Sequence, residues 1–244
     1  MLGMLIPTLF VATVLVARGA RPVPDAEALY AAASSEEPDA MRKAIAGLAD
    51  VEARDHCGYT PLGVMAFYGR RDAVEMLLAR GAAVDAPHPM LGTPLMLALR
   101  TGHAEVTRLL LERGADVNVV CDALDPLACA VLSNNPECVN LMLAAGADPH
   151  AKGRRYNLLS MAVQPDVAVM QQLLAVGVDP NQADADGSTP LMSAVEFDAL
   201  EGARLLLAAG ADASRAGTDG RTPRDFARQR GDRAMLEILE PVKK

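Results

Sequence analysis

Residues 93–115 read TPLMLALRTGHAEVTRLLLERGA, and both ends of this stretch recur along the chain. The closing Leu-x-x-Gly-Ala returns, with Val for Ala once, at residues 78–82, 111–115, 143–147, 174–178 and 207–211. The opening Thr-Pro-Leu returns in phase with it, 32 or 33 residues apart, as Thr60-Pro61-Leu62, Thr93-Pro94-Leu95, Asp125-Pro126-Leu127, Asn157-Leu158-Leu159, Thr189-Pro190-Leu191 and Thr222-Pro223-Arg224. Two markers that share one period indicate a repeat architecture.

Each marker has a physical role at a helix end. Thr or Asp before Pro predicts a helix start, because its side-chain oxygen accepts a hydrogen bond from an unsatisfied amide and Pro fits the first helical position. Gly after the Leu-rich run predicts a helix end, because Gly adopts the left-handed conformation without strain. A break inside each unit, at Gly69, Gly102, Asn134, Pro165 or Asp198, divides it into two helices. The expected fold class is therefore all-α, with helix-turn-helix units and projecting loops.

These residues resemble the ankyrin repeat family, whose pattern is D-x-x-G-x-T-P-L-H-x-A-A-x-x-G-H-x-x-V-V-x-x-L-L-x-x-G-A. The resemblance covers about residues 52–240 and implies an ankyrin-repeat solenoid capped at both ends. The His of T-P-L-H is absent throughout. The unit at about 151–181 lacks the Pro and has Pro165 in its turn, which predicts local distortion there. His103 occupies the G-H position of the family pattern, where a structural role is expected.

Four segments are expected along the chain. Residues 1–20 form an apolar signal peptide or anchor, and residues 21–51 form an N-terminal capping helix pair without the Thr-Pro-Leu marker. Residues 52–213 contain five ankyrin repeats. Residues 214–244 form a C-terminal capping repeat, in which charged residues replace leucines because one face of a terminal unit must meet water.

The composition narrows the function. The chain is 51% hydrophobic but only 3% aromatic, with no Trp, which suits a core of Ala, Leu, Val and Met between close-packed helices. Its net charge is −8 and it has no basic run, so a nucleic-acid partner is not expected. The sequence has no nucleophile motif, phosphate loop or catalytic carboxylate pair. We therefore expect neither an enzyme, nor a cofactor, nor a small-molecule substrate.

The first 17 residues carry no ionisable side chain. As a helix they would span about 24–26 Å, short of a ~30 Å hydrocarbon core, so they fit a secretory signal better, with Ala17 or Gly19 near the cleavage point. No cation precedes the apolar run, whereas Arg18 and Arg21 follow it, which opposes translocation. An uncleaved anchor and a buried helix or wrongly assigned start are the alternatives. The expected location is periplasmic after export, with a membrane-anchored or cytoplasmic protein as the alternative.

The cysteines and histidines do not form a metal site by their spacing. Cys129 and Cys138 fall where the family has apolar core residues, so we expect buried thiols, with a disulfide between them as the alternative. Cys57 and Cys121 lie on loops two units apart, on the order of 20 Å, which is too far for a disulfide.

Two further sets of residues superficially suggest metal binding. His56, Cys57 and His88 lie on adjacent loops but lack the local spacing of a zinc site. Residues 184–187 lack the other ligands of a calcium loop and match the D-x-x-G turn of the repeat instead. No metal is expected.

In this family the loop tips and the exposed face of each first helix form a concave binding surface. Five of the eight aromatic residues fall on positions there that the family pattern leaves open. Tyr and Arg anchors often supply most of the energy of an interface. The alternative is that Phe67 and Tyr68 only cover the seam against the N-terminal cap. The expected partner-binding residues are Tyr59, Phe67, Tyr68, Met90 and Arg100, with Arg154, Tyr156 and Phe197 as a second contact area.

The sequence therefore favours a scaffold that binds a folded protein. In the cell envelope such a scaffold would act as an inhibitor, an immunity protein or an accessory factor. The alternative is a membrane-tethered structural protein that keeps its apolar N-terminal segment.

Overall fold

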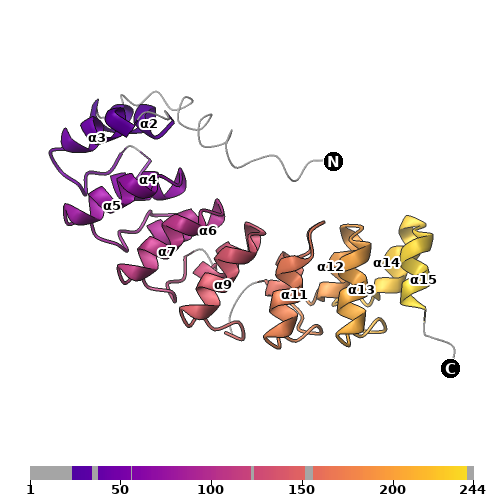
Figure 1. The fold of residues 1–244 in the computed structure, drawn as a ribbon. Helices are drawn as coiled ribbons and strands as arrows, with labels where there is room; N and C mark the ends of the chain where they lie inside the picture. Colours follow the sequence, from indigo (N-terminus) through magenta and orange to yellow (C-terminus); the bar gives the residue numbers. More distant parts are fainter. Residues whose placement is uncertain (1–23, 35–37, 56, 122–123, 152–155, 241–244) are drawn as a thin grey trace. The chain divides into compact units, whose positions relative to one another are not determined.

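A computed structural model describes residues 24–34, 38–55, 57–121, 124–151 and 156–240. All regular elements within these ranges are α-helices, which confirms the all-α prediction. The chain divides into two compact units, residues 1–122 and 123–244. In each unit the helices follow one another as antiparallel pairs (Figure 1). We call the two members of a pair the first helix and the second helix.

The described residues of unit 1 form three helix pairs. Their bounds are α2 (Pro24–Ser34) with α3 (Pro38–Ala46), α4 (Pro61–Phe67) with α5 (Arg71–Ala79), and α6 (Pro94–Arg100) with α7 (Ala104–Glu112). The first helices α2, α4 and α6 pack in series, and the second helices α3, α5 and α7 do the same. The result is a two-layer stack in which each pair covers the next.

In the part of unit 2 that the structure describes there are four helix pairs. Their bounds are α8 (Pro126–Leu132) with α9 (Pro136–Ala144), α10 (Leu158–Met161) with α11 (Ala168–Ala175), α12 (Pro190–Glu196) with α13 (Leu200–Ala208), and α14 (Pro223–Arg230) with α15 (Arg233–Leu239). The first helices pack in the order α8, α10, α12, α14. Helix α10 has only four residues, in the unit where the missing Pro and the presence of Pro165 predict distortion.

The predicted helix starts are confirmed at the level of individual hydrogen bonds. Thr60 Oγ1 accepts from the amide of Gly63 at 3.2 Å, and Asp125 Oδ1 accepts from Ala128 at 2.8 Å. The side chains of Thr93, Asn157, Thr189 and Thr222 accept in the same way. Since Asn157 caps α10 without a following Pro, the cap alone is enough to start a helix in this position.

The turns between helices also lie where the breaks predict them. Gly69 has φ +69, and the non-glycine residues Asn134 and Asp198 have φ +50 and +56. A Cβ on Gly69 would lie 2.5 Å from Nδ1 of His103, so both the backbone angle and the space require glycine there. His103 Nε2 donates to the carbonyl of Phe67 at 3.0 Å, which gives His103 the structural role expected from its G-H position.

The core consists mainly of Leu, Met, Val and Ala side chains between the two helix layers. The predicted apolar N-terminal segment, residues 1–17, lies outside the described residues. Among the helices that the structure does describe, none combines the length and the apolar character needed to cross a membrane.

Leu110 tests the repeat register, because its side chain is fully buried on α7. We expect Leu110→Ala to lower the free energy of unfolding by roughly 2–5 kcal/mol, through lost apolar burial and the cavity left behind. Glu112→Ala, an exposed change on the same helix, is the control and should stay within about 0.5 kcal/mol of the parent. Urea unfolding followed by circular dichroism measures both, and equal stability of the two variants would contradict the register.

Candidate interaction surface

Several of the loops that precede the first helices have a side-chain acceptor at the first residue of their turn. In unit 1, Asp55 Oδ1 accepts from the amides of Cys57 at 2.8 Å and Tyr59 at 2.9 Å, and the amide of Asp55 donates to the carbonyl of Tyr59 at 3.0 Å. The carboxylate thus closes a five-residue turn from its first position. This turn fixes where the exposed residues of the loop lie.

Tyr59 does not lie on the exposed surface, contrary to the prediction. Its side chain is only 8% exposed, and its ring centroid is 4.3 Å from that of His88 on the next loop. Burial, with Asp55 as a smaller contribution, raises the pKa of Tyr59 to about 12. The ring therefore fills the space between two neighbouring loops and holds them together instead of facing a partner.

Phe67 and Tyr68 lie together at the end of α4. Their ring centroids are 5.4 Å apart with an interplanar angle of 82°, an edge-to-face contact. Both side chains are half-buried, so part of each ring packs within unit 1 and part stays open to solvent. The backbone beneath them is fixed, because the carbonyl of Phe67 accepts the hydrogen bond from His103.

Arg100 is exposed at the end of α6, in the position that Phe67 occupies on α4. Because α4 and α6 pack against each other, the structure brings these two positions to one edge of unit 1. We call Phe67, Tyr68 and Arg100 the α4–α6 edge. Met90 is 74% exposed, but it lies on the loop before α6, at the opposite end of the first-helix layer.

Other arginines of unit 1 serve the fold. Arg54 Nη1 donates to the carbonyl of Pro87 at 2.6 Å and Arg70 Nε donates to that of Ala33 at 2.7 Å. Arg80 Nη2 donates to the carbonyl of Leu48 at 3.0 Å, and its Nη1 donates to that of Ile45. These cations hold adjacent helix pairs together, which distinguishes them from the exposed Arg100.

The sequence did not reveal how the N-terminal helix pair is tied to the next loop. The hydroxyl of Tyr30 on α2 donates to Oδ2 of Asp55, the carboxylate that also closes the first turn. Burial, followed by this hydrogen bond, raises the pKa of Tyr30. The sequence shows a Tyr in the first capping helix, but its partner is 25 residues away, a separation that the 32- or 33-residue period does not predict.

In unit 2 the predicted contact residues are separated. Tyr156 is 41% exposed just before α10, and Phe197 is 68% exposed just after α12. They lie at opposite ends of the first-helix layer, and a seven-residue first helix is about 10 Å long. Arg154 lies outside the described residues. Leu132, 42% exposed at the end of α8, is on the same side of the layer as Phe197.

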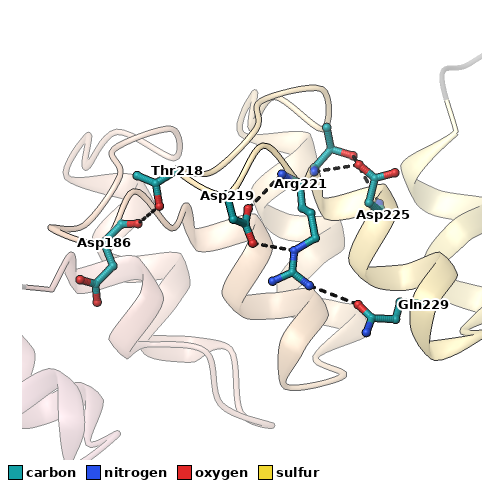
Figure 2. Close-up of polar contacts among 7 residues, drawn as sticks. Asp186, Thr218, Asp219, Arg221, Asp225 and Gln229 are labelled. Atoms are coloured by element: carbon teal, nitrogen blue, oxygen red, sulfur yellow. Dashed lines mark hydrogen bonds and ion pairs between the residues drawn. The ribbon is translucent and has the colours of Figure 1, made fainter.

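The loops at the C-terminal end of unit 2 are held by polar contacts (Figure 2). Thr218 Oγ1 donates to the carbonyl of Asp186 at 2.9 Å, and Arg221 donates to Asp219 Oδ2 at 2.6 Å and Gln229 Oε1 at 3.2 Å. Hydrogen bonds from Thr222 lower the pKa of the Asp225 carboxyl at the start of α14. These contacts stabilise the loop before α14 and tie it to the preceding loop and to α14 itself.

The motif at residues 184–187 is a turn of the repeat. Asp184 Oδ1 accepts from the amides of Asp186 and Ser188, both at 3.0 Å, as Asp55 does in unit 1. Among the described residues there is no group of three or more His, Cys, Asp or Glu placed to hold a metal ion. All four cysteines are among the described residues, and none of them is in a disulfide. Cys129 and Cys138 are fully buried.

The comparisons with known proteins agree with this geometry. A sequence profile described as "Ankyrin repeats (3 copies)" matches residues 87–153 and 158–241, and a profile described as "Ankyrin repeat" matches residues 57–86. The chain therefore belongs to the ankyrin repeat family, as its repeat pattern indicates. Proteins of this family are in general protein–protein interaction scaffolds, and the fold is typically a non-catalytic interaction module.

Solved structures of the family are similar in fold. The human ASB11 ankyrin repeat domain superposes with a TM-score of 0.77 and 24% identity, over 88% of this chain and 99% of that chain. An ankyrin repeat domain from Acinetobacter baumannii AYE superposes with a TM-score of 0.64 and 29% identity, over 73% of this chain and 95% of that chain.

A curated relative matches a shorter stretch of the chain. Over 80 residues the chain is 35% identical to the E3 ubiquitin-protein ligase KEG of Arabidopsis thaliana. The match covers 30% of this chain but only 5% of that ligase. The match is to a short segment of that ligase, and the properties of the whole ligase are not transferred to this chain.

Tyr59 and Phe197 make a matched pair for separating structure from surface. We expect Tyr59→Ala to lower the free energy of unfolding by about 3 kcal/mol, because a buried aromatic ring is removed from between two loops. Phe197→Ala removes a ring that is mostly solvated and should change stability by no more than about 0.5 kcal/mol. Thermal and urea unfolding measure both. Equal losses would show that the assignment of Tyr59 to the core is wrong.

Proposed function

We propose that this protein binds a folded protein partner through the α4–α6 edge of unit 1, with Met90 as a further contact; the exposed Phe197 side of unit 2 is a separate candidate contact area. The observation that carries the proposal is the pairing of two aromatic rings with an exposed guanidinium on adjacent first helices. Aromatic and Arg side chains are the residues most often found as energetic anchors of interfaces. They lie here on a rigid scaffold, which lowers the entropy lost on binding.

The contacts that hold the repeats together are made mainly by side chains outside the α4–α6 edge. The side chains that form the helix-start cap, the turn acceptor and the contacts between helix pairs here are those of Thr60, Asp55, Arg70 and His103, whereas Tyr68 takes part in the helix end through its backbone amide. A surface that the fold does not need is free to be shaped for recognition. The division between residues that stabilise the fold and exposed residues supports a binding role in which the exposed residues contact the partner.

We further propose that the protein acts in the cell envelope, as an inhibitor, immunity protein or accessory factor for an exported partner. The support is the apolar, uncharged stretch of residues 1–17. N-terminal sequencing of the mature protein from fractionated cells tests the export step. A mature chain that begins downstream of Ala17 supports cleavage, whereas recovery of the intact segment in the membrane fraction favours a tethered structural protein.

The binding role is tested with Tyr68→Ala and Arg100→Ala, singly and together with Phe67→Ala. Truncation of an anchor costs about 2 kcal/mol or more, so each single variant should bind its partner about thirty-fold more weakly with an unchanged melting temperature. Affinity capture from soluble and envelope fractions identifies the partner, and calorimetry on the purified pair gives the dissociation constants.

Phe197→Ala is the matched aromatic control for unit 2. A partner lost with the α4–α6 edge variants but retained by Phe197→Ala would confine recognition to unit 1. A partner retained equally by all variants would contradict the assignment of the edge. Weaker binding accompanied by an equal loss of stability would mean that Phe67 and Tyr68 only cover the seam against the N-terminal helix pair.

A further inference from the structure

Among the described residues, the turns at Asp55, His88, Asp184 and Gly217 close with the same backbone hydrogen bond, and the first three also have a side-chain acceptor at their first residue. In the turns that start at Asp55 and Asp184, the amide of the first residue donates to the carbonyl four residues on, and the first side chain accepts from two amides inside the turn. The turn at His88 closes with the same backbone hydrogen bond, from its amide to the carbonyl of Gly92 at 2.8 Å, although its glycine with positive φ is the fifth residue of the turn instead of the fourth. Its first side chain is an imidazole instead of a carboxylate.

Nδ1 of His88 is the side-chain acceptor of this turn, as the carboxylate is in the turns at Asp55 and Asp184. It accepts from the amides of Met90 at 3.0 Å and Leu91 at 3.1 Å. Nε2 lies 3.0 Å from the carbonyl of Cys57, to which it donates. Since one nitrogen must accept and the other must donate, this arrangement requires the neutral imidazole with its proton on Nε2.

The ring is enclosed on its other sides. His88 is 9% exposed and lies against the ring of Tyr59. A Cβ on Gly58 would be 2.9 Å from Cδ of Pro89, and a Cβ on Gly92 would be 2.4 Å from Sδ of Met96. The loop is therefore packed closely against its neighbours.

We propose that His88 is a positioning residue that holds the exposed Met90 at the loop tip only while its ring is neutral, so that mild acid releases this loop and weakens binding through Met90. The first part concerns the protein alone, whereas the effect on binding rests on the proposed function. A carboxylate remains an acceptor down to about pH 4, and an imidazole loses its acceptor at a higher pH, with an ordinary pKa of about 6.5. The turns at Asp55 and Asp184 therefore stay closed over the range in which the His88 turn opens.

The groups around His88 act in opposite directions. Burial is the largest influence and lowers the pKa of His88, and the Arg54 guanidinium lowers it further. The hydrogen bond with the carbonyl of Cys57 and the Asp55 carboxylate raise it. Tyr59, the remaining titratable neighbour, keeps its proton because its own pKa is about 12.

The direction of the pH effect follows from this balance. A native pKa below the unfolded value of about 6.5 means that the folded loop disfavours the imidazolium. The stability that His88 contributes is fully present above about pH 6.5 and is lost as the pH falls through the lower native pKa. Once Nδ1 carries a proton, it faces two amide donors, and Met90 and Leu91 lose their acceptor.

Amide hydrogen exchange on the full-length protein, resolved by NMR between pH 7.5 and 5, tests the release without any partner. After correction for intrinsic exchange rates, protection of the Met90 and Leu91 amides should fall about ten-fold across this range. The amides of Cys57 and Tyr59, in the matched Asp55 turn, should keep their protection. Long-range ¹⁵N spectra should show Nδ1 of His88 gaining its proton over the same pH interval.

His88→Asp is the decisive variant, because it gives this turn the carboxylate acceptor that the turns at Asp55 and Asp184 have. It loses the hydrogen bond to the Cys57 carbonyl, yet protection of Met90 and Leu91 should become independent of pH in this range. His150→Gln, on an exposed loop of unit 2, should leave the pH dependence unchanged. His103→Asn controls for the other histidine of unit 1 whose pKa burial lowers.

Several results would overturn the proposal. Protection at Met90 and Leu91 that follows that of Cys57 and Tyr59 at every pH would do so, as would a pH dependence that survives in His88→Asp or disappears in His103→Asn. If His88→Asp does not fold, the ¹⁵N spectra of the parent decide, because Nδ1 must gain its proton where protection is lost.

Binding is tested separately with the captured partner. Affinity should fall between pH 7.5 and 5.5 in the parent and stay level in His88→Asp. An equal fall in both would overturn the link between this loop and binding. Failure to capture any partner at either pH would count against the proposed function and leave the result on loop release as it stands.

Discussion

A helix of seven or nine residues is too short to be stable by itself in water, and within each unit the described helix pairs depend on a neighbouring pair to cover their apolar faces. This constraint explains why the same residues recur every 32 or 33 positions. Each pair needs an acceptor to start its first helix, a glycine to end its second, and small or aliphatic side chains between the layers. Residues that meet these needs are not available for recognition.

Features that arise within one unit could be predicted from the sequence, because their causes are local. The caps at Thr60 and Asp125 bond amides three residues away, and the turn at Gly69 is required by its own backbone angle. The shortened α10 follows from Pro165 and the missing Pro at the start of its unit. The family pattern adds the order of the units, and the described helices agree with it.

The interaction surface could be predicted only in part, because exposure depends on contacts one repeat away. Phe67, Tyr68 and Arg100 come together because α4 and α6 are adjacent, which the period already implies. Tyr59 was assigned to the same surface, but it packs on His88, 29 residues further along the chain. Nothing in the repeat pattern distinguishes an open aromatic position that points outward from one that fills the space between loops.

A repeat protein provides its own control for unusual residues, since equivalent positions can be compared within a single chain. The acceptor position of the loop turn holds Asp in the turns at residues 55 and 184 and His at residue 88. Because the same closing hydrogen bond forms with a carboxylate at residues 55 and 184 and with a glycine at residue 217, that bond does not by itself require an imidazole. What imidazole adds is a change of charge at a higher pH than that of a carboxylate, in a buried position. A loop that carries an exposed methionine above such a group is therefore a place where the scaffold and its binding surface become coupled.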